Sequence, residues 1–387
     1  MQFHWFLPTY GDSRTIVGGG HGMLAGQASG DRRASIGYLS SIARAAEELG
    51  FLGALTPAGA WCEDAWLTTA MLARESERLA FLIAFRPGLV SPTLAAQMAA
   101  TFSTHAPGRL LLNVVTGGES HEQQQYGDHL DKDARYERCD EFLTVVRGLW
   151  SGERVTLRGK HIDVIDAGIP TLPDPVPPLY FGGSSAAALP VAARHIDVYL
   201  TWGEPPAAVA AKVARVRALA AAQGRTVRFG IRLHVITRDT SEQAWAQAQQ
   251  LLAALDPDVV AGAQANLARS ESTGQNNMRA LHAAARADGS WQDAHTLEVS
   301  PGLWAGVGLV RGGAGTALVG SHTEVADRIE EYADLGIDEF VLSGYPHLEE
   351  LYWFGEGVLP QLRRRGRWAG AGAPVVSSHV PFLPAAH

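Results

Sequence analysis

The stretch RFGIRLHVIT, residues 228–237, has the composition of a buried β-strand but carries two polar residues in its middle. Apolar side chains on both faces are typical of a strand in a parallel sheet that helices cover on each side. Arg232 and His234 are two residues apart, so side chains that alternate along a strand place both on one face. Because Arg and His are seldom fully buried without a partner, the pair indicates either a structural ion pair or a functional site.

Seven further apolar segments alternate with amphipathic ones along the chain. Helix start signals support the alternation: Ser91 precedes Pro92 at one predicted start, and Ser321 with Glu324 forms a capping box at another. Eight strands that each lead into a helix predict a (β/α)8 TIM barrel of the α/β class. The other seven predicted strands lie in residues 3–9, 51–57, 79–87, 109–117, 178–185, 197–203 and 338–347.

The irregular segments define the expected domain organisation. We expect one barrel domain over residues 1–360, with an insertion at about 255–320 before the last strand–helix unit. Within the insertion, GLVRGGAGTALVG (308–320) places a single cation, Arg311, among glycines. This composition favours a mobile lid near 305–320 over a plain linker. Residues 361–387 are expected to form a Gly-, Ala- and Pro-rich C-terminal extension.

Composition excludes several classes of function. The 387 residues are 46% hydrophobic and 19% charged, as in a soluble globular protein, with a formal net charge of −8. No basic run is present, so neither nucleic acid nor an anionic membrane is expected as the main partner. No apolar run approaches the ~20 residues of a membrane span, and the N-terminus lacks the pattern of a signal peptide. We therefore expect a cytoplasmic protein.

Metal and nucleotide motifs are absent from the sequence. Two cysteines, Cys62 and Cys139, cannot form a disulfide framework, and neither HExxH nor an HxH on the first strand occurs, so we expect no metal. The Walker motif and a GxGxxG after a strand are also missing. FGGSSAA (181–187) instead places a Gly-Gly-Ser-Ser turn before a predicted helix, where backbone N–H groups can hold a phosphate or simply cap the helix.

A barrel builds its active site at the carboxyl ends of its strands and in the loops that follow them. Aromatic, basic and hydroxyl side chains converge there with few carboxylates, which suits an anion and a flat aromatic ligand. Each residue also has a simple packing explanation; Cys62, for example, can be a small buried hydrophobic side chain. The last strand repeats the spacing of Arg232 and His234, which favours a site. The residues at the mouth are Tyr10, Cys62, Arg86, Thr116, Ser184, Trp202, Arg232, His234, Tyr345 and His347.

Several long motifs resemble the FMNH2-dependent alkanesulfonate monooxygenases of the bacterial-luciferase-like flavin superfamily. They include HWFLPT, CEDAW, NVVTGG, LYFGGSS, YLTWGEPP, RFGIRLHVI, LWAGVGLVRGGAGTALVG and FVLSGYPHLEE, and the resemblance extends from about residue 3 to residue 355. It implies a barrel with an insertion and a two-component system, in which a separate NAD(P)H-dependent FMN reductase supplies reduced FMN. Reduced FMN and O2 then form the oxidant that cleaves the C–S bond of an organosulfonate to sulfite and an aldehyde. Relatives assemble as homodimers or homotetramers.

The resemblance also implies roles for individual residues. Catalytic positions match Cys62, Trp202, Arg232, His234, Arg311, Tyr345 and His347, and flavin-binding positions match Thr116, Tyr136, Ser184 and Ser185. Arg232 and Arg311 suit a sulfonate because Arg forms several charge-assisted hydrogen bonds with tetrahedral oxyanions. Imidazole titrates near ~6.5, so His234 is expected to order or protonate the oxidant. Tyr345 and His347 are expected to donate to developing oxyanions, with Trp202 as an apolar wall.

One departure affects the expected substrate. Relatives typically have FLPTHGD after the first strand, whereas this chain has FLPTYGD with Tyr10 in place of His. Tyr titrates near ~10 and cannot share the proton chemistry of imidazole, although it still offers a hydrogen bond to substrate. The alternative substrates are a sulfosugar, a sulfone or a small heterocycle. The alternative to an enzyme is a catalytically silent flavin-binding barrel. A neutral substrate is disfavoured because it leaves two buried arginines unpaired.

Overall fold

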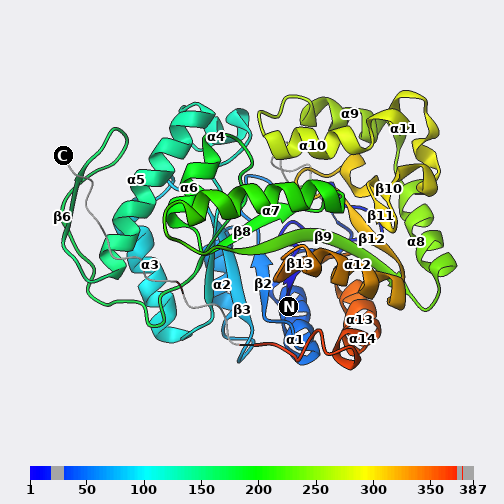
Figure 1. The fold of residues 1–387 in the computed structure, drawn as a ribbon, viewed down its shortest axis with the longest axis horizontal. Helices are drawn as coiled ribbons and strands as arrows, with labels where there is room; N and C mark the ends of the chain where they lie inside the picture. Colours follow the sequence, from blue (N-terminus) through cyan, green and yellow to red (C-terminus); the bar gives the residue numbers. More distant parts are fainter. Residues whose placement is uncertain (19–29, 373–376, 378–387) are drawn as a thin grey trace.

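Eight parallel strands close into a barrel in the computed structural model, which describes residues 1–18, 30–372 and 377 (Figure 1). Each strand pairs with the next, and β13 pairs with both β9 and β1, which completes the ring. The predicted TIM-barrel fold is therefore confirmed. In ring order the strands are β1 (Gln2–Phe6), β2 (Gly53–Thr56), β3 (Ala80–Phe85), β4 (Leu110–Val114), β7 (Leu179–Phe181), β8 (Val198–Trp202), β9 (Arg228–Arg238) and β13 (Glu339–Ser343).

Helices surround the barrel, and two of them begin at the predicted start signals. Ser91 accepts a hydrogen bond from Leu94 N with Pro92 at the first helical position, and Ser321 and Glu324 form the capping box. The helices outside the insertion are α1 (Ile36–Leu49), α2 (Ala65–Leu72), α3 (Pro92–His105), α4 (Ser120–Gln125), α5 (Lys132–Trp150), α6 (Ala188–His195), α7 (Pro206–Ala221), α8 (Ser241–Ala253), α12 (His322–Asp334), α13 (His347–Gly357) and α14 (Leu359–Arg364). None of the described helices has the length and apolar character that a membrane span requires.

The insertion between α8 and α12 folds over one part of the barrel (Figure 1). Residues 317–321 belong to a strand, so the irregular part of the predicted lid is shorter than 305–320. The reason is that β9 runs past the barrel, and its residues 234–238 pair in parallel with β12. The elements of the insertion are α9 (Pro257–Leu267), α10 (Thr273–Leu281), α11 (Ala283–Ala287), η1 (Ser290–Gln292), η2 (Ala294–Leu297), β10 (Glu298–Ser300), β11 (Leu303–Trp304), η3 (Gly306–Leu309) and β12 (Ala317–Ser321).

Two peripheral features differ from the sequence-based expectation. An antiparallel hairpin of β5 (Val155–Arg158) and β6 (Asp163–Ala167) follows α5 and was not predicted. Helix α14 continues to Arg364 because Leu362 is buried, so the C-terminal extension starts later than residue 361. Trp368 then packs beneath the barrel with its ring 6.1 Å from that of Phe3. Residues 373–376 and 378–387 of the predicted extension lie outside the described residues.

A buried polar network fills the barrel interior at the amino ends of the strands. Glu339 Oε2 lies 2.9 Å from His4 Nε2 and accepts a hydrogen bond from the Tyr180 hydroxyl at 2.8 Å. Arg228 pairs with the other carboxylate oxygen at 3.2 Å. With this end filled, a ligand reaches the barrel from the carboxyl ends of the strands.

Candidate active site

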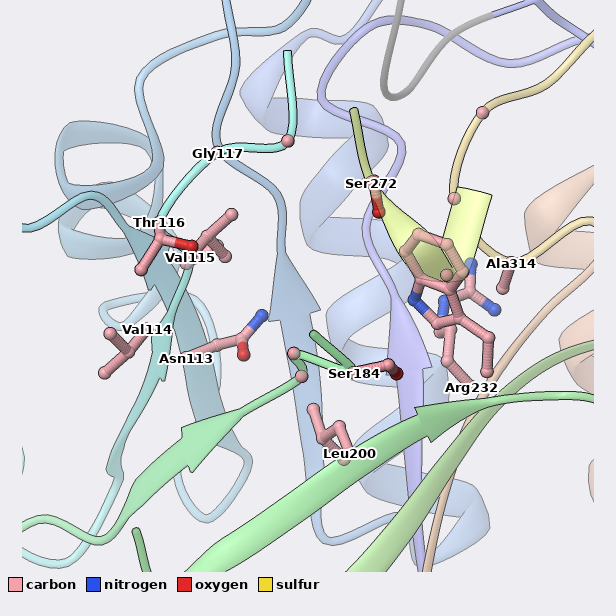
Figure 2. A pocket seen from close by; sticks show the side chains of 18 of the residues that line it. Asn113, Val114, Val115, Thr116, Gly117, Ser184, Leu200, Arg232, Ser272 and Ala314 are labelled. Carbon is pink, nitrogen blue, oxygen red and sulfur yellow. The ribbon is translucent and has the colours of Figure 1, made fainter. Parts of the chain in front are cut away.

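An open pocket lies at the carboxyl ends of the barrel strands. It contains about 1350 Å³ of space outside the atoms, part of which is continuous with solvent. Figure 2 shows Asn113 and Thr116 on one side, Arg232 and Ala314 on the other, and Ser184 between them. The insertion contributes residues 272–274 and 311–314 to the wall, so the pocket belongs to the barrel and the insertion together.

The first end of the pocket is a cluster of hydroxyl groups, which we call the hydroxyl end. Tyr136 hydrogen-bonds to the side chains of Thr116 and Ser185, and burial raises the pKa of its phenol, so it stays a neutral donor. Thr116 follows β4, Tyr136 lies on α5, and Ser184 and Ser185 lie in the turn between β7 and α6. All four residues predicted to bind flavin therefore line one end of the pocket.

Lys132, which was not predicted as a site residue, adds a positive charge at the hydroxyl end. It is half-buried, lines the pocket and lies one helical turn before Tyr136 on α5. None of the described carboxylates forms an ion pair with it. The spacing i, i+4 from Tyr136 was the available signal, because such residues share a helix face.

The hydroxyl end fits the phosphate of FMN. A phosphate needs several hydrogen-bond donors and a positive charge, which the hydroxyls and Lys132 supply. Backbone N–H groups of the glycines at 182 and 183, also in the pocket wall, can approach such a group closely. Apolar side chains next to this end, among them Leu55, Val114 and Leu200, offer a surface for a flat ring. The residues present therefore match both parts of a flavin mononucleotide.

The opposite end of the pocket contains two buried guanidinium groups, and we call it the arginine end. Arg232 is 7% exposed and donates to Ser343 Oγ at 2.8 Å and to Leu233 O at 2.5 Å. Arg311 is 3% exposed and donates to the Tyr10 hydroxyl at 2.6 Å. Neither arginine forms an ion pair with any described Asp or Glu, and the undescribed segment 19–29 contains no acidic residue.

Aromatic rings surround these two charges. The Arg232 Cζ atom lies 4.6 Å from the centre of the Phe6 ring, and Arg311 Cζ lies 4.8 Å from that of Tyr10 and 5.8 Å from that of Trp61. Cation–π attraction offsets part of the cost of burying a charge. Burial, with a smaller effect of Arg311, nevertheless lowers the pKa of Arg232 to about 9. An anion between the two guanidiniums would relieve this cost, so the arginine end is suited to bind an anion.

His234 lies behind Arg232, and its imidazole is fully engaged. The ring is 2% exposed, with Nδ1 2.7 Å from Ser343 Oγ and Nε2 3.1 Å from Ala314 O. Burial, together with the charge of Arg232, holds its pKa well below the usual value of 6.5. The expectation that His234 titrates near neutrality is therefore wrong in this arrangement. A neutral imidazole with both nitrogens hydrogen-bonded has no proton to offer the pocket.

Tyr345 and His347 also lie outside the pocket wall. The Tyr345 hydroxyl is 3.5 Å from that of Tyr10 and 3.4 Å from Val17 O, and its ring stacks on His234. His347 is fully buried, with Nδ1 3.1 Å from Phe6 O, and burial and Arg311 hold its pKa well below the usual value. The two residues support Tyr10 and Phe6, which contact the arginines.

Cys62 and Arg86 have structural partners. The Cys62 Sγ atom lies 3.5 Å from Gly59 O, and burial raises the pKa of the thiol to about 12, so it is not a thiolate. Packing, the simpler of the two explanations for Cys62, agrees with this environment. Arg86 forms a buried ion pair with Glu122 at 2.7 Å.

Trp202 lines the pocket against the insertion. A Cβ atom at Gly274 would lie 3.0 Å from its ring, so a larger residue there would press on the indole. Phe6, Trp61, Asn113 and residues 272–274 also line the pocket and were not singled out in the sequence. Trp61 could have been found from its place directly before Cys62, whereas the insertion residues carried no local signal. Among the described residues, no group of three His, Cys, Asp or Glu side chains could hold a metal ion.

Comparison with known proteins gives one family and a set of similar folds. The family model described as luciferase-like monooxygenase matches residues 1–339. A riboflavin lyase solved with modified FMN and riboflavin is 21% identical, with a TM-score of 0.77 over 97% of this chain and 94% of that one. EDTA monooxygenase from Chelativorans sp. BNC1 is 20% identical, with a TM-score of 0.72 over 96% and 95%. A long-chain alkane monooxygenase is 18% identical, with a TM-score of 0.74 over 96% and 94%. At these identities the solved structures establish a shared fold.

Proposed function

The chain belongs to the luciferase-like monooxygenase family, and on that premise we propose that it cleaves the C–S bond of an organosulfonate with reduced FMN and O2. The products are sulfite and an aldehyde. One oxygen atom of O2 enters the aldehyde and the other leaves as water, while reduced FMN is oxidised. The class of monooxygenase follows from the family; the substrate is the proposal.

The two buried arginines without a carboxylate partner carry this proposal. Arg232 and Arg311 come from β9 and the insertion and face the same end of the pocket. A sulfonate is a permanent anion whose three oxygens can each accept charge-assisted hydrogen bonds. A neutral substrate would instead leave two desolvated cations uncompensated, which is costly.

The hydroxyl end of the pocket supports FMN as the cofactor in this proposal. Thr116, Tyr136, Ser184 and Ser185, with Lys132, would hold the phosphate of FMN, as the fit of their hydroxyls and charge supports. Bound reduced FMN supplies the electrons that activate O2. Trp202 and Trp61 contribute apolar surface that excludes water from the reacting end, and exclusion of water protects a reactive oxidant from side reactions.

Two partners belong to the proposal. The resemblance to two-component flavin monooxygenases, together with the family match, supports a separate NAD(P)H-dependent FMN reductase that supplies reduced FMN. We also expect a homodimer or homotetramer. Apolar side chains that face solvent on α2 and α3 support self-association; Leu67 is 65% exposed, Met71 55% and Leu94 45%.

Sulfite release tests the proposal. The purified protein would receive reduced FMN from any flavin reductase, O2, and sulfonates from methanesulfonate to octanesulfonate together with a sulfosugar. We expect sulfite from at least one of these classes, in an amount equal to the aldehyde formed. Hydrogen peroxide without sulfite from every sulfonate would overturn the substrate assignment while leaving the flavin chemistry intact.

A further inference from the structure

Ser343 lies between the two polar residues of β9 and has no role in the site described so far. It is the last residue of β13 and is fully buried. Parallel pairing places it directly opposite His234, and its hydroxyl lies 2.8 Å from Arg232 Nη2 and 2.7 Å from His234 Nδ1. One hydroxyl therefore contacts both the anion-binding guanidinium and the imidazole.

Arg232, Ser343, His234 and Ala314 form a hydrogen-bonded chain. The donor and the acceptor of each bond follow from the groups at its two ends, the guanidinium of Arg232 and the carbonyl of Ala314. A guanidinium only donates, so Ser343 Oγ accepts from Arg232, and the single hydroxyl proton of Ser343 points to His234 Nδ1. Nδ1 must then be the acceptor nitrogen of a neutral imidazole, which places the ring proton on Nε2. Nε2 lies 3.1 Å from Ala314 O, which only accepts, so the assignment is consistent from Arg232 to Ala314.

The last hydrogen bond of this series, from His234 to Ala314 O, reaches the loop that carries Arg311. We define the Arg311 loop as residues 308–315; its neck is closed by a hydrogen bond from Gly308 N to Gly315 O at 2.8 Å. A Cβ atom at Gly315 would lie 2.7 Å from Gly308 Cα, so the neck is closely packed. His234 holds Ala314 O just inside this neck, three residues after Arg311. The imidazole proton at Nε2 thus provides one of the contacts that hold the Arg311 loop, together with the hydrogen bond from Gly313 N to Gln275 Oε1 at 2.8 Å.

We propose that Ser343 is a positioning residue that couples the two arginines of the anion site. By accepting from Arg232 it fixes the guanidinium that β9 provides. By donating to His234 it sets the tautomer that holds the Arg311 loop against the barrel. The proposal rests on the proposed function for the identity of the anion, but the hydrogen-bonded chain stands without it.

The test compares Ser343→Ala with Thr237→Val. Thr237 is a matched control because its buried hydroxyl also lies 2.8 Å from a histidine Nδ1, that of His322; it lies on β9, away from the pocket. In flavin-free protein, we expect Ser343→Ala to weaken octanesulfonate binding by roughly tenfold in calorimetry, because Arg232 loses a fixed acceptor. We expect trypsin to cut after Arg311 about five- to tenfold faster, since cleavage follows the population of opened loops. Thr237→Val should leave both measurements near wild type.

The histidine tautomer gives a readout that general loss of stability does not move. Nitrogen-15 NMR of the wild type should show His234 neutral with its proton on Nε2, and Ser343→Ala should shift this signal. If Ser343→Ala does not fold, His234→Gln interrupts the same chain from its other side and must also accelerate cleavage after Arg311.

The outcomes separate this inference from the proposed function. Equal cleavage rates after Arg311 in Ser343→Ala and Thr237→Val would overturn the coupling, whatever the sulfite assay yields. A wild-type His234 proton on Nδ1 would do the same. Faster cleavage and a shifted tautomer without sulfite from any sulfonate would support the coupling and reject the substrate.

Discussion

The hydroxyl end and the arginine end of the pocket are built in different ways. At the hydroxyl end, hydroxyl donors and the half-buried Lys132 lie at the ends of β4 and β7 and on helix α5, close to one another along the first half of the chain. At the arginine end, two buried charges are held by rings and hydroxyls from distant segments; Arg311 and its partner Tyr10 are 301 positions apart. A hydroxyl donor near solvent can hydrogen-bond to water when it has no other partner. A buried charge has lost its hydration and needs hydrogen-bond acceptors or aromatic rings around it.

This difference predicts separable functions for the two ends. Substitutions at the arginine end should affect the anionic substrate and leave flavin binding unchanged, while substitutions at the hydroxyl end should do the reverse. The insertion contributes residues 272–274 and 311–314 to the pocket wall, so its attachment bears on both ends.

The largest effect is expected for Arg232→Ala. Loss of two or more charge-assisted hydrogen bonds should lower kcat/KM for sulfite release by about 10³-fold, because such bonds contribute about 1.5–3 kcal/mol each. The affinity for reduced FMN should change by less than about twofold, since Arg232 lies at the opposite end from the hydroxyl cluster. Steady-state sulfite assays and anaerobic flavin titration measure the two quantities.

Arg232→Lys is the matched control for the charge. It keeps a cation but loses the planar fork, so we expect an intermediate loss of about tenfold. Sulfite turnover that survives Arg232→Ala would show that the anion binds elsewhere.

A smaller effect, on flavin binding instead of on the anionic substrate, is expected for Lys132→Gln. Removal of this charge should weaken FMN binding by roughly tenfold at low salt and leave riboflavin binding unchanged, because riboflavin lacks the phosphate. Fluorescence titration with both flavins measures the difference. Lys160→Gln serves as control, since Lys160 is an exposed residue paired with Glu137. An equal loss for FMN and riboflavin would mean that the phosphate does not bind at the hydroxyl end.

The smallest effect concerns the attachment of the insertion next to the hydroxyl end. The Ser270 hydroxyl donates to Glu119, whose side chain is buried; burial raises the pKa of this carboxyl to about 7. Between its usual value and about 7 the folded state keeps a proton that the unfolded state releases, so this contribution to stability falls as pH rises through that window. Hydrogen exchange of residues 270–274, corrected for intrinsic rates, should show about threefold more opening at pH 8 than at pH 5.

Glu119→Gln should remove this pH dependence because an amide does not titrate. Glu271→Gln removes a half-exposed carboxylate from the same connection and should keep the pH dependence, because burial, and not the charge of Glu271, is the main cause of the raised Glu119 pKa. A pH dependence that persists in Glu119→Gln would show that another group controls the attachment.

Local patterns explain which parts of the fold were predictable. The eight barrel strands and the caps at Ser91 and Ser321 follow from apolar runs and side-chain oxygens close in sequence. The sequence predicts residues 317–320 of strand β12 as part of a lid because their glycine-rich surroundings resemble a loop. Its strand conformation depends on pairing with the extension of β9, a partner about eighty residues earlier in the chain.

The candidate site also combines features that the sequence predicts with features that only the folded structure determines. The sequence alone placed Arg232 and His234 on one face of a strand, and it grouped the hydroxyl residues through their strand-end positions. Only the tertiary structure decided that Arg232 has no acidic partner among the described residues, that His234 is neutral and hydrogen-bonded at both nitrogens, and that Arg311 meets Tyr10. The physical reason is that strand periodicity is set by neighbours in the chain, whereas burial, charge pairing and tautomer are set by segments that meet only in the folded barrel.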